Sequence, residues 1–448
     1  MKQLTLPKLY PVTCHTDNVG PCSTFVVIQG YQHDGAKYIE QAIKKGALKI
    51  VLDVKQQKTL IKQDGIEYIF VENTRKVLAD LSGKSLNYPS TKLKIIGITG
   101  TKGKTTTTYL IEHILKQSGF KTALLGTIKN KILDFEIQSE RTTPQSDFLH
   151  IFFDQCVKNN VDFVVMEVSS HALSLDRIHG IEFDTIGFTN LAPEHLDFYK
   201  NMNEYFQAKF KIFDHIKLNS PIVINSDDKW GQKAIKKLSV KNLNLIQFSK
   251  NDVKINSKNM PGEFNEYNIT MSFLICKQLK ISEEKIIGAI KNFDGIPGRM
   301  QKHILKNNAH AFIDYAHNPS SFEASLKALK KLNSNLIVVF GCGGDRDKTK
   351  RPIMGNIAAK YAKKIILTDD NPRFEDREQI IKEIYAGICQ SKQKNVLCIP
   401  DRKIAIKKAV ELSNEDSLIA ILGKGHENYY SIKGKSFYFD DFEEISKY

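Results

Sequence analysis

The sequence has few cysteines, and their pattern excludes a disulfide framework. There are seven in 448 residues, at Cys14, Cys22, Cys156, Cys276, Cys342, Cys389 and Cys398. The number is odd, no C-x-x-C pair occurs, and no two histidines stand at the spacing of a zinc site. We therefore expect reduced thiols and no zinc module.

Long apolar runs are also missing. No eighteen consecutive apolar residues occur, and the opening MKQLTLPKLYPVT lacks the basic and apolar segments of a secretory leader. Internal repeats and low-complexity tracts are absent as well. These absences predict a cytoplasmic protein without membrane insertion.

Acidic residues are outnumbered, since 50 Asp and Glu stand against 65 Lys and Arg, a net charge of +15. Such a surplus suits anionic partners, which include nucleotides, nucleic acid and lipid headgroups, and charge alone does not choose among them. Hydrophobic residues make up 41% of the chain, which excludes a disordered protein. At roughly 150 residues per domain, the length predicts about three domains.

Alternating apolar strands and helix-length segments predict the α/β class. Residues 25–30 and 49–53 are expected strands around a helix at 39–47, in a small first domain over 1–88. A second domain, 89–297, is expected to hold a mostly parallel sheet. Its predicted strands are 94–99, 163–168, 185–190 and 221–225. A third, Rossmann-like domain is expected over 298–448. Its predicted strands are 311–316, 336–341, 364–370, 395–400 and 417–423.

A phosphate-binding loop is the strongest local motif. The strand KIIGIT runs into GTKGKT, and a helix is expected to open at Lys104. Gly100 and Gly103 would let backbone N–H groups approach phosphate, Lys104 would supply a charge, and Thr105 a hydroxyl for Mg²⁺. The loop is shorter than G-x-x-x-x-G-K-T, because Ile98 occupies the place of the first glycine. The alternative is a glycine turn that caps a helix and binds nothing.

The loop and the motifs after it resemble the Mur ligase family. In chain order the later motifs are MEVSSHAL (166–173), NLAPEHLDFY (190–199), QAK (207–209), GEFNEYN (262–268), PGRM (297–300), DYAHNP (314–319), GCGGDRDKTKRP (341–352), DDNPR (369–373) and GKGHE (423–427). The resemblance implies a three-domain architecture: a small N-terminal α/β domain, a central P-loop ATPase-like domain and a C-terminal Rossmann-like domain.

The resemblance also implies an activity. It is an ATP-dependent ligation that adds meso-diaminopimelate to UDP-N-acetylmuramoyl-L-alanyl-D-glutamate through an acyl phosphate, in peptidoglycan precursor synthesis. ATP and Mg²⁺ are the implied cofactors. The three small-molecule substrates are the implied partners, and we expect a monomer that binds no nucleic acid.

Four residues carry the implied catalysis: Lys104, Glu167, His195 and Lys209. Glu167 also ends an apolar strand, where open parallel sheets place ligands. By resemblance, Thr105, Glu167, His195 and a carbamylated Lys209 serve the metal. The simpler alternative for Lys209 is a solvated lysine on a helix.

The resemblance also implies two groups of substrate-binding residues. ATP would contact Gly100, Thr101, Lys102, Gly103, Lys104, Thr105, Thr106, Asn268, Arg299, Asp314 and Asn318. The UDP-sugar peptide would contact Tyr31, Gln32, His33, Thr142, Thr143, Ser169 and Arg177. Around this second set the sequence departs from the family at Asn18, Val19 and Leu175.

Arg373 is the residue expected to select the amino acid. It follows the strand KIILTDD, and its planar guanidinium suits the second carboxylate of diaminopimelate. The resemblance completes the pocket with Arg346, Asp370, Asn371, Pro372, Gly423 and Glu427. The alternative is that Arg373 only pairs with Glu375 or Asp376.

Three other functions stay open at this point. The same ligation could use L-lysine. A folylpolyglutamate synthetase-like ligase shares the chemistry but would lack a UDP-binding first domain and the DNPR motif. A basic P-loop protein that binds nucleic acid would need clustered Lys and Arg with aromatic residues between them, whereas the lysines here are spread along helices.

Overall fold

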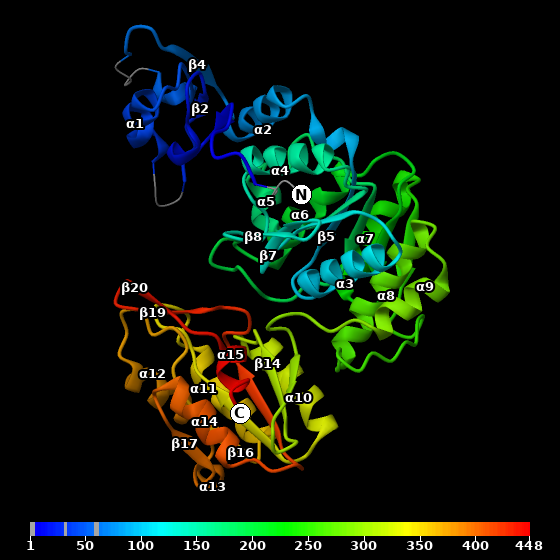
Figure 1. Ribbon diagram of the computed structural model, residues 1–448, viewed down its shortest axis with the longest axis vertical. Helices are drawn as coiled ribbons and strands as arrows, with labels where there is room; N and C mark the ends of the chain where they lie inside the picture. The colour runs from blue at the N-terminus through cyan, green and yellow to red at the C-terminus, as the bar shows by residue number, and fades with distance from the viewer. Residues whose placement is uncertain (1–4, 31–33, 58–61) are drawn as a thin grey trace. The chain divides into compact units, whose positions relative to one another are not determined.

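A computed structural model describes residues 5–30, 34–57 and 62–448, and it divides into two compact units (Figure 1). Unit 1 holds the chain up to residue 254 together with 267–289. Unit 2 holds 255–266 and 290–448. The α/β class is confirmed in both units. The expected domain boundaries at 88 and 297 stay predictions.

Unit 1 begins with a four-stranded parallel sheet in the order β1-β2-β3-β4. Its strands are Val12–Thr13, Thr24–Val26, Lys49–Asp53 and Glu67–Val71, and its helices are α1 (Ile39–Lys44) and α2 (Thr74–Ser85). Ile50 and Val51 pack into separate apolar clusters on the two faces of the sheet, so β3 is buried on both sides. The expected strand at 25–30 is shorter than predicted, because pairing ends at Val26.

Polar contacts join this sheet to the rest of unit 1. Asn73 caps α2 through the N–H groups of Arg75 and Lys76, and its side-chain amide donates to Asp176 at 3.1 Å. The hydroxyl of Thr13 donates to Asp147 at 2.9 Å. These two hydrogen bonds therefore link β1 and the start of α2 to α4 and to the segment that follows α5.

The second sheet of unit 1 has eight strands in the order β12-β11-β10-β5-β9-β6-β7-β8, and only β7 runs opposite to the others, so its pairs with β6 and β8 are antiparallel. The strands are β5 Lys94–Thr99, β6 Thr122–Leu125, β7 Lys129–Ile132, β8 Phe135–Gln138, β9 Phe163–Glu167, β10 Thr185–Phe188, β11 Ile222–Asn225 and β12 Leu245–Phe248. The helices are α3 Lys104–Gln117, α4 Ser146–Lys158, α5 Ser170–Ser174, α6 Met202–Phe210, α7 Lys229–Leu238, α8 Glu263–Gln278 and α9 Glu283–Lys291.

The predicted central strands are confirmed, and their pairing positions the site. β5 lies between β9 and β10, and its residues Ile95, Ile96 and Ile98 are fully buried, as expected of a strand covered by helices on both faces (Figure 1). Parallel strands end at the same edge. The loops after β5, β9 and β10 therefore meet there, where open α/β sheets bind ligands.

Unit 2 is a Rossmann-like six-stranded sheet in the order β13-β14-β18-β15-β16-β17, parallel except for β13. The strands are β13 Gln301–Ile304, β14 His310–Asp314, β15 Leu336–Phe340, β16 Lys364–Leu367, β17 Val396–Cys398 and β18 Leu418–Leu422, and a hairpin adds β19 Tyr429–Ile432 and β20 Lys435–Tyr438. The helices are α10 Pro319–Leu332, α11 Lys350–Tyr361, α12 Arg377–Tyr385, α13 Gln390–Gln393, α14 Arg402–Glu411 and α15 Asp441–Ile445.

Alternate residues of the unit 2 strands enter two apolar clusters, one on each face. In β15, Val338 packs with α10 and α11, whereas Val339 packs with α14. This doubly covered sheet explains the continuous apolar runs that predicted the strands. Within the described ranges, no helix has the length and apolar character needed to span a membrane.

Candidate active site

The loop after β5 requires glycine at two positions. Gly100 has a φ of 144°, and a Cβ there would lie 1.9 Å from Thr189 Oγ1. Gly103 has a φ of 86°, and its Cβ would lie 2.4 Å from Asn268 Oδ1. Helix α3 begins at Lys104 as predicted, so its first backbone N–H groups border this loop and suit an anion.

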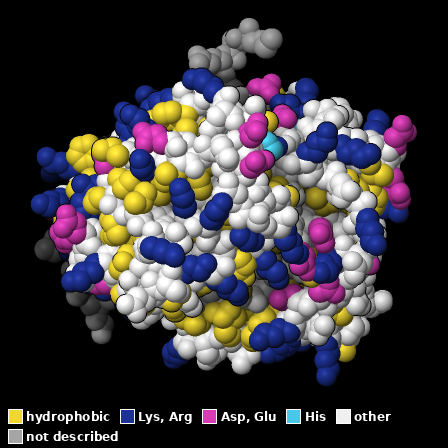
Figure 2. All heavy atoms as spheres, turned by 90° about the horizontal axis from the view of Figure 1, so that it is seen from below, with side chains coloured by type: hydrophobic (Ala, Val, Ile, Leu, Met, Phe, Trp, Pro, Cys, Tyr) yellow, Lys and Arg dark blue, Asp and Glu magenta, His cyan; other side chains and the backbone are white. Residues whose placement is uncertain are grey.

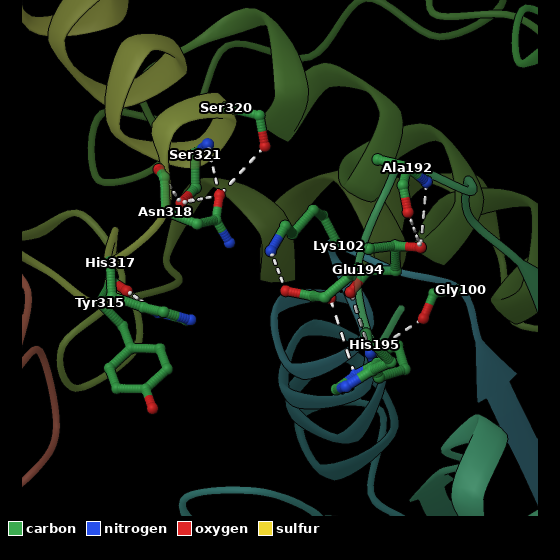
Figure 3. A network of polar contacts seen from close by, with 12 residues as sticks. Gly100, Lys102, Ala192, Glu194, His195, Tyr315, His317, Asn318, Ser320 and Ser321 are labelled. Carbon is green, nitrogen blue, oxygen red and sulfur yellow. Dashed lines mark hydrogen bonds and ion pairs between the residues drawn. The ribbon is translucent and has the colours of Figure 1, made fainter. Parts of the chain in front are cut away.

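Two lysines hold the loop. The Lys104 ammonium donates to the carbonyls of Gly100 and Thr101 at 2.9 and 3.0 Å. Lys102 pairs with Glu194 at 2.6 Å, a contact that Figure 3 draws. The pair, together with Lys104 and His195, keeps the pKa of Glu194 below its ordinary value although burial opposes this. The loop thus carries two cations beside the start of α3.

Other residues of the predicted loop set are placed by neighbouring groups. Thr101 Oγ1 lies 3.2 Å from the hydroxyl of Tyr205 and is buried. Thr106 is half-buried in the first turn of α3. Thr107 donates to Asn268 Oδ1 at 3.4 Å, so Asn268 reaches α3 from α8.

Glu167 lies at the carboxyl end of β9 and is 1% exposed. Its carboxylate accepts from the Thr105 hydroxyl at 3.0 Å, and from the backbone and hydroxyl of Thr127 at 2.8 and 3.1 Å. The structure thus brings together the predicted pair, Thr105 and Glu167.

These oxygens fit Mg²⁺, which prefers hard oxygen ligands and is usually held by one or two carboxylates plus phosphates and water. In the described part of the chain, no group of three or more His, Cys, Asp or Glu residues could hold a metal by itself. A metal beside Thr105 and Glu167 would therefore need ligands from substrate or water.

Lys209 is buried, 1% exposed, on helix α6. Its ammonium nitrogen donates to Gly100 O at 2.8 Å and lies 4.9 Å from the centre of the Tyr205 ring. Burial, with the charge of Lys104 nearby, holds the pKa of Lys209 well below its ordinary value. The alternative of a solvated lysine is therefore wrong.

His195 lies in a loop after β10, with a left-handed φ of 58°. Its ring is 4.8 Å from that of His171, and its Nε2 is 3.9 Å from Glu194. Burial lowers the pKa of His195, and Lys209 and Lys104 lower it further. These effects outweigh the opposing charge of Glu194 and favour the neutral imidazole, the form that can bind a metal. No hydrogen bond joins His195 to Glu167, although the structure describes both residues.

The residues predicted for the sugar-peptide gather beside Glu167. The Thr143 hydroxyl donates to Glu167 O at 2.9 Å and accepts from Ser169 N at 3.0 Å. Arg177 donates to Thr143 O at 2.9 Å. Thr142 Oγ1 lies 3.0 Å from Thr127 Oγ1. Tyr31, Gln32 and His33, predicted for the uridine, lie outside the described residues.

In unit 2, the residues predicted to bind ATP lie around the loop after β14: Arg299, Asp314 and Asn318. Asp314 accepts from Met300 N at 2.8 Å and Ser325 Oγ at 2.9 Å, and burial raises its pKa despite nearby Arg299. Asn318 caps α10, where it accepts from Ser321 N at 3.1 Å (Figure 3). Asp314 and Asn318 therefore also shape this loop, and their contact with ATP stays a prediction.

Arg373 follows β16 with a left-handed φ of 52°. Its guanidinium donates to Gly344 O at 2.7 Å, and its backbone N–H donates to Ser431 O at 2.9 Å. Glu375 instead pairs with Arg351 at 3.0 Å, and Asp376 caps α12. The alternative that Arg373 only pairs with a nearby acid is therefore wrong, because it forms no ion pair with a described carboxylate.

Of the other residues predicted for the amino acid, Asn371 and Asp370 lie near Glu427. Asn371 donates to Glu427 at 2.9 Å, and burial, with Asp370 nearby, raises the pKa of Glu427. Gly423 has a φ of 115°, and a Cβ there would lie 2.6 Å from Asp370. Arg346 is exposed, and its guanidinium donates to the backbone carbonyl of Asp345 at 3.4 Å. Pro372 O packs so closely on Gly344 that a Cβ there would clash.

Sequence reasoning missed several contacting residues. Glu194 adjoins His195 in the motif NLAPEHLD, so its place in the motif could have indicated it. No sequence motif indicated Thr127, because its contact with Glu167 depends on the turn between β6 and β7. Tyr315 and Lys424, which contact Glu427, stand inside the quoted motifs DYAHNP and GKGHE.

Three family models match the chain in order. Residues 8–85 match "Mur ligase family, catalytic domain", residues 98–292 match "Mur ligase middle domain", and residues 298–425 match "Mur ligase, glutamate ligase domain". Together they confirm the expected three-part architecture.

Individual proteins agree with these models. A UDP-N-acetylmuramoyl-L-alanyl-D-glutamate–2,6-diaminopimelate ligase of Clostridium acetobutylicum is 41% identical over 95% of this chain and 91% of its own length. A solved structure of a ligase of that name is 28% identical, covers 98% of this chain and 94% of its own, and has a TM-score of 0.68. A MurF ligase of Thermotoga maritima in complex with ADP, 16% identical over 99% of this chain and 98% of its own, shares the fold with a TM-score of 0.63. The chain belongs to the Mur ligase family.

Proposed function

We propose that this protein adds meso-diaminopimelate to UDP-N-acetylmuramoyl-L-alanyl-D-glutamate, with conversion of ATP to ADP and phosphate. One observation carries this: 41% identity to a ligase of that name over 95% of the chain. The geometry supports it, because Lys104, Thr105 and Glu167 lie together and Arg373 forms no ion pair with a described carboxylate.

The first chemical step is activation of the dipeptide's terminal carboxylate. A carboxylate is a poor electrophile until its oxygen attacks the γ-phosphorus of ATP, which forms an acyl phosphate and releases ADP. Little covalent help from the protein is needed, so positioning and charge dominate. The N-terminus of α3 and Lys104 are suited to bind the phosphates.

Thr105 and Glu167 are the residues that would hold Mg²⁺. When bound, the ion neutralises charge on the phosphates. The chain's own part is to keep these oxygens together, which Thr127 does by donating twice to the Glu167 carboxylate.

Lys209 suits carbamylation. A neutral amine attacks the carbon of CO₂, so that one N–C bond forms while one C–O π bond breaks and leaves its electron pair on oxygen, and the nitrogen loses a proton to water. Only an uncharged lysine reacts this way, and the depressed pKa of Lys209 supplies one. The product carries a negative charge beside the Lys104 ammonium group, which would favour it.

The second step is attack by the amine of diaminopimelate on the acyl phosphate, which forms the amide and releases phosphate. Arg373 would bind the far carboxylate through two parallel hydrogen bonds. Glu427 and Asn371, which lie 2.9 Å apart, would bind an ammonium group. Arg346, Asp370 and Gly423 complete this pocket.

The peptide part of the UDP-linked precursor would lie along Thr142, Thr143, Ser169 and Arg177, next to Glu167. Its terminal carboxylate would then lie near the phosphate loop. ATP and nucleotide sugars are cytoplasmic metabolites, and we infer that the protein works in the cytoplasm, as a monomer.

An assay of phosphate release tests the function. Release should require ATP, Mg²⁺, the UDP-linked dipeptide and meso-diaminopimelate together, and omission of any one should reduce it to background. Release that needs only ATP would contradict the proposal.

The other candidate functions have less support. A folylpolyglutamate synthetase-like ligase would lack a UDP-binding first domain, whereas residues 8–85 match a Mur ligase model. On the face in Figure 2, Lys and Arg side chains are spread among acidic and apolar ones, which does not favour nucleic-acid binding. L-lysine as substrate would leave Arg373 opposite an ammonium group.

A further inference from the structure

Two residues outside the predicted amino-acid pocket, Tyr315 and Lys424, also contact Glu427. One carboxylate oxygen accepts from Asn371 at 2.9 Å, and the other accepts from the hydroxyl of Tyr315 at 3.2 Å. Lys424 lies 3.9 Å from the first oxygen. Both oxygens therefore have a neutral donor, and a cation lies at longer range.

Lys424 is fully buried, which is unusual for a lysine. Its ammonium group donates to the backbone carbonyl of Tyr429 and to Asn371 Oδ1, and it lies 4.7 Å from the Tyr430 ring centre. A buried charge is costly unless it is paired. Burial lowers the pKa of Lys424, and the negative charges of Asp370 and Glu427 oppose this, so Lys424 and these carboxylates depend on each other.

Tyr315 touches residues predicted for two different substrates. The Arg299 guanidinium, expected at the ATP phosphates, lies 4.7 Å from the centre of the Tyr315 ring. The hydroxyl of the same ring reaches Glu427, expected at the amino acid. Figure 3 shows Tyr315 beside His317, whose Nδ1 lies 2.8 Å from Tyr315 O, so the backbone here is also fixed.

We propose that Tyr315 and Lys424 are positioning residues that hold Glu427 ready for the ammonium group of the incoming amino acid. This inference rests on the proposed function. Because each contact fixes one oxygen or balances its charge, loss of either should weaken binding of the amino acid and spare ATP.

Tyr315→Phe is the main test, because it keeps the ring against Arg299 and removes only the hydroxyl. We expect the KM for meso-diaminopimelate to rise about 3- to 10-fold, the worth of one hydrogen bond. The KM for ATP and the kcat at saturating amino acid should stay within about twofold of wild type. Lys424→Met should raise the amino-acid KM by at least about 10-fold, because it leaves buried carboxylates without their cation.

Matched controls exist in the same unit. Tyr361→Phe removes another tyrosine hydroxyl that donates to a glutamate, Glu323, at 3.0 Å. Lys408→Met removes another lysine paired with a glutamate three residues on, Glu411. Both controls should leave every KM unchanged.

An unchanged amino-acid KM in Tyr315→Phe overturns the inference. So does an equal rise in both KM values, which would indicate a merely structural role. If thermal unfolding shows that Lys424→Met does not fold, Tyr315→Phe alone decides. Wild type that fails to ligate diaminopimelate overturns the proposed function instead, so the two failures are distinguishable.

Discussion

Two lysines share one acceptor in the candidate active site. Lys104 and Lys209 donate to the carbonyl of Gly100 at 2.9 and 2.8 Å, from helices far apart in the sequence. Two ammonium groups so close repel each other, and burial makes water a poor screen. Burial of Lys209, followed by the charge of Lys104, therefore lowers the pKa of Lys209 well below its ordinary value.

Lys104→Ala should reduce kcat for phosphate release at least about 1,000-fold, because a fixed cation at the transferring phosphoryl group is lost. Lys116→Ala, on the same helix but exposed and paired with Asp134, is the control and should retain full activity. Normal ligation by Lys104→Ala would contradict the P-loop assignment.

Lys209→Ala should be nearly inactive and partly restored by short-chain carboxylic acids, which replace the missing carbamate. Amines of similar size should not restore activity, because they lack the negative charge. Steady-state rates with and without each additive provide the measurement. Wild-type activity in Lys209→Ala would mean that the buried amine has only a structural role.

Arg373→Ala should reduce kcat/KM for meso-diaminopimelate while changing that for L-lysine little, so the ratio of the two falls. Sites built to pair a polar group can reject an analogue that lacks it by roughly 10⁴-fold. If Arg373→Ala does not change the ratio of the two kcat/KM values, Arg373 does not bind the second carboxylate.

At the scale of elements, an ion-pair network ties α11 to the segment just after Arg373 and to α12. Arg351, fully buried, pairs with Glu375 at 3.0 Å and with Glu383 at 2.7 Å. Its guanidinium also donates to Gly343 O at 3.2 Å. This network stabilises the backbone around Arg373 and Arg346.

Acid should loosen this network. The hydrogen bond from Arg351 lowers the pKa of Glu375 from 4.5 to about 2, so the folded state binds fewer protons than the unfolded chain. Its stabilising contribution is complete above about pH 4.5 and is lost as the pH falls toward 2. Glu375→Gln should reduce the free energy of unfolding, measured with urea, at pH 6 more than at pH 3.

The control for this experiment is Glu411→Gln, which removes an exposed glutamate paired with Lys408. It should affect unfolding little at either pH. An equal loss at both pH values for Glu375→Gln would contradict the assigned pKa.

The central strands could be predicted because β5, β9 and β15 are buried on both faces, and their sequences are therefore nearly continuous runs of apolar residues. The helix at Lys104 could be predicted from the glycines before it. The contact of Thr127 with Glu167, or of Tyr315 with Glu427, could not, since each joins segments whose proximity depends on strand order. The left-handed backbone of Arg373 follows from its pairing with β19, which no local pattern specifies.

At the scale of the whole molecule, the net charge of +15 fits the proposed substrates, which carry phosphates and carboxylates. Three family models match at 8–85, 98–292 and 298–425. Under the proposed function, the small sheet would bind the nucleotide sugar, the P-loop part ATP, and the Rossmann-like part the amino acid. This division stays a prediction for each binding residue.

Product identification in a competition reaction tests the central claim most directly. Wild-type protein is incubated with ATP, Mg²⁺, UDP-N-acetylmuramoyl-L-alanyl-D-glutamate and equal amounts of meso-diaminopimelate and L-lysine, and the nucleotide products are identified by mass spectrometry. The account predicts one new product, the dipeptide precursor extended by diaminopimelate, with one ADP formed per product. A lysine-extended product in similar amount, or ADP without any extended product, would contradict it.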